Sequence, residues 1–115
     1  MGKSTKVEIP EQQLAAFDQL VERFDDIERK GKTAPYTSVN GHMFSLLAKD
    51  GTLGIRLDKA DQADFRGQYE SGDFVQYGAV MRDYVRVPKS LQLDIDAMAP
   101  WFAKAHAFAS SLKPK

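Results

Sequence analysis

The chain reads YTSVNGHMFSLLAKDGTLGIRL from Tyr36 to Leu57, and this stretch carries the strongest structural signal in the sequence. It contains the pairs Asn40-Gly41 and Asp50-Gly51, residue types that tolerate the positive φ angles of tight hairpin turns. The pairs separate three β-prone runs, which we expect at residues 36–39, 42–49 and 52–57. In the third run, apolar and polar residues alternate with the period of a half-buried strand. The stretch therefore predicts a three-stranded antiparallel meander.

Amphipathic helices are predicted before and after this meander. From about residue 10 to residue 30, apolar residues recur at spacings of three and four, which is the period of one helix face. A second helix is expected over 58–71, with Asp58 as its N-cap. A third is expected from Asp94 or Asp96 to residue 112. Each would bury one apolar stripe.

A further strand is predicted over 80–87, and a short one over 74–77. Alternation would place Met81, Val85 and Val87 on its buried face and leave Arg82, Tyr84 and Arg86 outside. The full order is then α-β-β-β-α-β-β-α. Helices packed on an antiparallel sheet in this order make a two-layer α+β domain.

The predicted core consists of apolar residues from the inner faces of these elements. We expect these side chains to be mostly buried: Leu14, Phe17, Val21, Phe24, Phe44, Leu46, Leu53, Ile55, Val85, Phe102 and Phe108.

Length and composition indicate one ordinary globular domain. The chain has 115 residues, of which 43% are apolar and 28% charged, so we take 1–115 as one domain with an ordered core over about 10–112. It has no cysteine, which excludes disulfides, thiolate metal sites and thiol nucleophiles. No cofactor is expected.

The balance of charge indicates which classes of partner the chain is expected to bind. Sixteen basic residues balance sixteen acidic ones, and this neutrality argues against a nucleic-acid partner, because domains that bind many phosphates are usually basic. No apolar run approaches the length of a membrane helix, so no membrane association is expected. The N-terminus lacks the apolar segment of a signal peptide, and we expect a cytoplasmic protein.

A catalytic constellation is not evident. The two histidines, His42 and His106, are isolated in sequence, and no metal-ligand spacing is present. The glycine-rich phosphate-binding motifs and the G-x-S-x-G nucleophile motif are also absent. We therefore expect neither an enzyme nor a metal site.

Two features nominate binding residues. The first is the polar stretch 33–38, which contains Tyr36 where the sheet begins, and His42 follows the first turn. The second is the outward row of Arg82 and Tyr84, with Arg56 on a neighbouring strand. Arginine beside tyrosine suits a carboxylate, a phosphate or a protein partner. The alternative is an ordinary solvated sheet face.

Three stretches together resemble the N-terminal domain of the TfoX/Sxy proteins. They are Val39-Asn40-Gly41-His42-Met43-Phe44, Leu53-Gly54-Ile55-Arg56-Leu57, and the run from Gly78 to Pro88, GAVMRDYVRVP. The similarity spans residues 11 to 112, and the YjbR-like proteins are the nearest alternative family. The resemblance implies a secretion-chaperone-like fold and an association with regulation of competence for DNA uptake in bacteria.

Together these observations lead to one main expectation and two alternatives. The main one is a non-enzymatic interaction or regulatory domain whose partner is another protein or a second copy, as in a homodimer. The alternatives are a small-ligand or anion-binding domain using Arg56, Arg82 and Tyr84, and a nucleic-acid-associated competence-type regulator.

Overall fold

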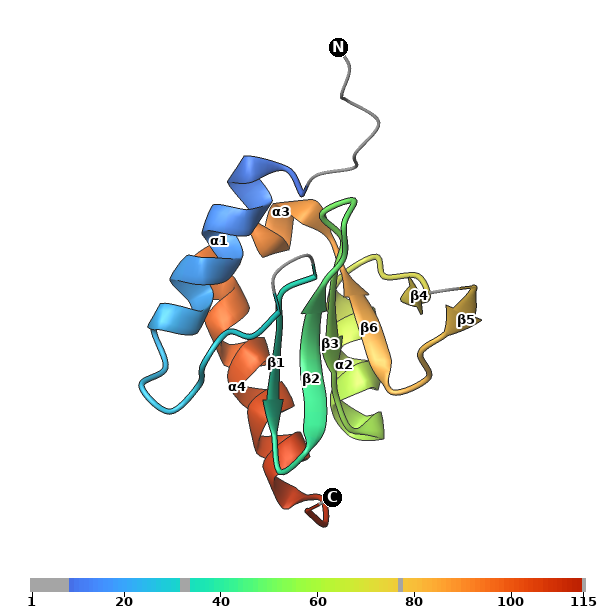
Figure 1. Ribbon diagram of the computed structural model, residues 1–115. Coiled ribbons are helices and arrows are strands. Elements are labelled where there is room, and N and C mark those ends of the chain that lie inside the picture. The colour runs from blue at the N-terminus through green and yellow to red at the C-terminus, as the bar shows by residue number, and fades with distance from the viewer. Residues whose placement is uncertain (1–8, 32–33, 77, 115) are drawn as a thin grey trace.

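The computed structural model describes residues 9–31, 34–76 and 78–114, and it has the mixed α+β architecture that the sequence predicts (Figure 1). The helices are α1 (Glu11–Glu22), α2 (Lys59–Gln68), α3 (Lys89–Gln92) and α4 (Ile95–Ser111). The strands are β1 (Tyr36–Val39), β2 (His42–Leu47), β3 (Leu53–Arg56), β4 (Val75–Gln76), β5 (Ala79–Val80) and β6 (Tyr84–Val87).

The main sheet has four antiparallel strands in the order β1-β2-β3-β6. The two predicted turns join its first three strands, and they use positive φ at Asn40 (55°), Gly41 (80°) and Gly51 (92°). The meander is thus confirmed, with β2 and β3 shorter at their ends than predicted.

A β-bulge on β2 sets the side-chain pattern at the start of that strand. Thr37 pairs with Ser45 but Ser38 pairs with Met43, so Phe44 has no partner residue in the register. Such a bulge lets two consecutive residues contribute to one face. The Phe44 ring packs 5.5 Å from that of Phe102 in α4, while the buried hydroxyls of Thr37 and Ser45 bond to each other.

Two apolar clusters stabilise the fold, one on each face of the sheet. The main cluster lies between the sheet and the helices, and it includes most of the predicted core. Leu46 is instead buried in a smaller cluster with Phe74 and Tyr84. Three predicted core residues are only half-buried: Leu14 and Phe24 pack against the main cluster, and Phe108 lies near Arg56.

Helix α4 follows the prediction closely, but α1 is shorter than predicted and one short helix was missed. Helix α1 ends at Glu22, eight residues before the expected end, although Ile27 beyond it is still buried. Asp25 and Asp26 explain the stop, because aspartate is a poor helix former and its charge opposes the helix dipole at a C-terminus. The short helix α3, ahead of α4, was not predicted.

A buried polar clasp ties the β2–β3 turn to two helices. The side-chain amides of Gln13 in α1 and Gln92 in α3 each donate to the carbonyl of Gly51 at 2.9 Å. Gln13 also donates to the Gln92 side-chain oxygen at 3.3 Å. The two glutamines thereby satisfy a buried carbonyl that no strand reaches.

Neighbouring segments of the chain form hydrogen bonds with the backbone of both edge strands of the main sheet, and in this sense they interrupt its edges. At β1, Lys30 and Tyr36 exchange two backbone hydrogen bonds of 2.8 and 2.9 Å. At β6, the Ser71 hydroxyl donates to the Arg86 carbonyl at 2.7 Å. Interrupted edges discourage further strands from joining the sheet.

Candidate functional site

The outer face of the sheet is covered where the sequence predicted an open binding face. The chain after α2 crosses this face and places Phe74 directly over Gly54, where an added Cβ would lie 2.5 Å from the Phe74 ring. Phe74, Leu46 and Tyr84 form the second buried cluster, and Tyr36, Met43 and Met81 pack against it. The predicted strand 80–87 is in fact two elements, because Ala79–Val80 pairs with Val75–Gln76 instead of β3.

Tyr84 is buried, which corrects the expectation that it points into solvent. Its ring stacks on Phe74 with the centroids 5.7 Å apart, and its hydroxyl donates to the Met43 carbonyl at 2.6 Å. Burial raises the pKa of the Tyr84 phenol, an effect that the nearby Arg56 charge only partly opposes. Tyr84 therefore acts as a neutral cross-strand brace between β6 and β2.

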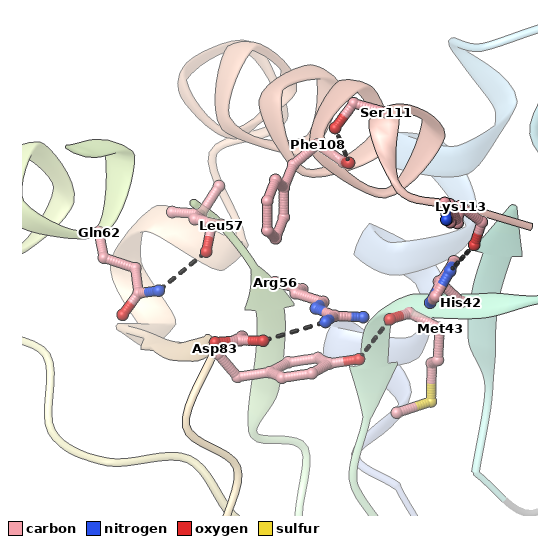
Figure 2. Close-up of polar contacts among 10 residues, drawn as sticks. His42, Met43, Arg56, Leu57, Gln62, Asp83, Phe108, Ser111 and Lys113 are labelled. Atoms are coloured by element: carbon pink, nitrogen blue, oxygen red, sulfur yellow. Dashed lines mark hydrogen bonds and ion pairs between the residues drawn. The ribbon is translucent and has the colours of Figure 1, made fainter. Parts of the chain in front are cut away.

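Arg56 lies next to Tyr84 in the strand register and is mostly buried, with its side chain 22% exposed. Its Nη2 donates to Asp83 Oδ2 at 3.0 Å, and its guanidinium carbon is 5.6 Å from the centre of the Phe108 ring. Figure 2 shows the guanidinium between Phe108 on one side and Asp83 on the other, pointing toward β2. Its Nε is buried and has no hydrogen-bond partner among the described residues.

His42 lies at the start of β2, at the same end of the sheet as Arg56 and Tyr84. We call this end of the sheet the corner. Its Nε2 is 2.7 Å from the Lys113 carbonyl, just beyond the end of α4 (Figure 2). Because a carbonyl oxygen only accepts, Nε2 carries the hydrogen, and the Nδ1 atom of a neutral ring is then an acceptor. Within the described ranges, the buried Nδ1 has no partner.

The remaining predicted site residues are not part of this corner. Arg82 is exposed in the turn between β5 and β6, and Arg86 is exposed on β6, where Ser71 bonds its carbonyl. Tyr36 is half-buried against the second cluster. The structure thus brings Arg56, Tyr84 and His42 to one end of the sheet, and it places Arg82 and Tyr36 elsewhere.

Comparison with known proteins adds no assignment. No protein-family model and no curated protein matches this chain. The described residues contain no group of three or more His, Cys, Asp or Glu side chains placed to hold a metal ion. None of their helices is long and apolar enough to cross a membrane.

The β4–β5 hairpin carries a feature that the sequence reasoning missed. Val75 and Val80 are directly opposite each other in the register, and their exposed fractions are 49% and 52%. Figure 1 shows the hairpin standing out beyond β6. The available signal was the run FVQYGAVM over residues 74–81, which is β-prone, has no charge and contains a turn glycine.

Proposed function

We propose that this chain is a non-catalytic interaction domain and that it pairs with a second copy of itself through the β4–β5 hairpin. The observation that carries the proposal is the exposed cross-strand pair of Val75 and Val80. Contiguous exposed apolar surface marks interaction sites, and this pair is the exposed aliphatic surface of the hairpin.

Charge favours a second copy as the occupant. A two-fold interface brings each patch against its own image, so any net charge in the patch is repelled by the same charge in the partner. Residues 74–81 contain no charged side chain, and the whole chain has a formal net charge of zero. The hairpin can therefore meet its own copy without electrostatic cost.

The two-stranded form of the hairpin supports the same pairing. Strands β4 and β5 form a two-stranded sheet, so each has one partner strand and one outer edge. An outer edge can pair with another chain by strand addition. The strands have two residues each, which limits the area buried, and stable dimers usually bury about 800 Å² per partner. The expected dimer is weak and depends on concentration.

The family and setting are part of the proposal. We assign the chain a regulatory role of the TfoX N-terminal type in the bacterial cytoplasm, on the strength of the three sequence stretches that resemble that family. The observed order of a helix, three strands, a helix, further strands and a closing helix supports this assignment. A nucleic-acid partner is not included, because the chain is neutral.

Sedimentation equilibrium tests the proposal. We expect the wild-type mass to rise toward the dimer between about 10 µM and 1 mM, the range of a weak association. The double variant Val75→Ser/Val80→Ser should remain monomeric throughout that range. The matched control is Ala63→Ser/Ala107→Ser, which alters two exposed positions on α2 and α4 and should dimerise like the wild type. A wild-type chain that stays monomeric, or a hairpin variant that still dimerises, refutes the proposal.

A further inference from the structure

The environment of Arg56 suggests a second function that does not depend on the hairpin. A guanidinium has five N–H donors. Two of its edges, the side formed by Nε and Nη2 and the end formed by Nη1 and Nη2, each present a pair of N–H groups that suits the two oxygens of a carboxylate. The side edge consists of Nε–H and one Nη2–H. Asp83 contacts only the Nη2 half of this edge, at 3.0 Å.

The other half of the edge has no acceptor among the described residues. Arg56 Nε is buried and makes no hydrogen bond to any described residue. Leaving a buried donor of a charged group unpaired is costly. The Tyr84 hydroxyl donates to the Met43 carbonyl and does not accept from Arg56 Nε, which has no partner among the described residues.

Asp83 holds its half of the edge loosely. Its side chain is 50% exposed, and it lies in the turn between β5 and β6. An ion pair with one exposed partner contributes little to stability. The backbone carbonyl of Asp83 bonds the Leu57 amide at 3.0 Å, so the turn can keep its position when the side chain swings away.

We propose that the Nε–Nη2 edge of Arg56 is a carboxylate-binding site and that the Asp83 side chain is its exchangeable internal occupant. An incoming carboxylate displaces the single Asp83 contact and accepts from both Nε and Nη2. The Phe108 ring, 5.6 Å from the guanidinium carbon, forms one wall of this site.

The chemistry of the ligand follows from the site itself. The group that contacts this edge in the structure is already a carboxylate, that of Asp83. The flat guanidinium beside an aromatic ring favours a planar anion. A single cation suits one negative charge better than the two of a phosphate monoester.

The experiment follows the Nε–H resonance of Arg56 by ¹H–¹⁵N NMR while acetate is added to the full chain. The resonance is assigned by its loss in Arg56→Lys. Ionic strength is held constant with sodium chloride, because added salt alone weakens surface ion pairs. We expect a saturable shift with a dissociation constant of about 1–100 mM, the range of a single weak contact.

Removing the internal occupant should strengthen binding. In Asp83→Asn we expect acetate to bind about tenfold more tightly, since the competing carboxylate is gone. Asp83→Ser repeats the test should the asparagine variant fail to fold. The matched control is Asp73→Asn, which removes one exposed acidic charge elsewhere and should keep the wild-type affinity. The exposed Arg82 Nε–H is an internal control, and it should shift without saturating.

Two results would overturn the proposal: no saturable shift in Asp83→Asn up to about 100 mM acetate, or equal tightening in Asp73→Asn. A parallel titration with an end-blocked Gly-Glu-Gly peptide identifies the source of the carboxylate. Tighter binding of the peptide indicates an acidic side chain presented by a protein, whereas tighter binding of acetate indicates a small free acid.

Discussion

The stability of the fold depends on pH in the alkaline range through the phenol proton of Tyr84. Its hydroxyl lies between two strands, bonded to the Met43 carbonyl, and burial raises its pKa above the ordinary value of 10.0. The unfolded chain releases this proton near pH 10, whereas the folded chain retains it. A raised folded pKa therefore leaves stability unchanged below about pH 10 and lowers it above that pH.

We predict that the free energy of unfolding falls between pH 10 and pH 11, with Tyr84 contributing a slope of at most about 1.4 kcal/mol per pH unit. Urea titrations across this range measure the fall. Tyr84→Phe should be less stable at pH 7 by about 1 kcal/mol, because the Met43 carbonyl loses its donor, yet it should lose less on going to pH 11.

The matched control is Tyr36→Phe, which removes a phenol from the edge of the same cluster. It should retain the alkaline loss of the wild type. A Tyr84→Phe variant with an unchanged pH profile would contradict the assignment of this proton to Tyr84.

Sequence reasoning placed Arg56 and Tyr84 together on the outer face of the sheet, where the register pairs them, but it predicted that this face is exposed. Phe74 instead stacks on Tyr84 there, and the chain turns at Arg82 and Asp83, so Arg82 does not continue the row. The partners of Arg56 and Tyr84 are Met43, Asp83 and Phe108. All three lie outside β3, so no local pattern in β3 could identify them.

At the scale of elements, the β2–β3 turn depends on more than its own residue types. Gly51 has a φ of +92°, and a Cβ there would lie 2.7 Å from the Gln13 amide. Gly78, between β4 and β5, also has a positive φ, +77°, but a Cβ there meets no atom within 4 Å. Substitutions at these two glycines therefore distinguish the cost of backbone strain from the cost of losing the clasp of Gln13 and Gln92.

We predict that Gly78→Ala lowers the free energy of unfolding by about 1 kcal/mol, the cost of a left-handed backbone for a residue with a side chain. Gly51→Ala should cost about 2–4 kcal/mol, since it also displaces the buried Gln13 amide from the Gly51 carbonyl. Urea denaturation of the two variants provides the comparison. Equal losses would show that the clasp contributes nothing to stability.

How far each element could be predicted follows from how local its determinants are. The hairpin turns at Asn40-Gly41 and Asp50-Gly51 are fixed by backbone preferences of those residues, and both were predicted. The β4–β5 hairpin depends on tertiary packing, notably that of Phe74, and it was predicted poorly.

At the scale of the whole molecule, the sheet separates two clusters of different size. Phe17 belongs to the main cluster beneath the helices, and Phe74 to the smaller one on the outer face. Both side chains are buried, with exposed fractions of 1% and 0%. Their loss should nevertheless have different consequences, because only the first cluster joins α1 and α4 to the sheet.

We predict that Phe17→Ala lowers global stability by about 3–5 kcal/mol, the usual cost of a large cavity in a core. Phe74→Ala should instead loosen the outer layer, and amide hydrogen exchange should accelerate mainly over residues 74–81. Denaturant titration and exchange measured on both variants distinguish the two effects. Uniformly faster exchange throughout Phe74→Ala would contradict a layered core.

The interrupted edges of the main sheet, at Lys30 and Ser71, bear on how this chain behaves when it is crowded. A fibre lengthens only if every copy that joins exposes a fresh strand for the next one. Here the longest strands are flanked by their own chain, so polymerisation finds no template in them. We therefore expect the main sheet not to seed fibres even when the chain is concentrated.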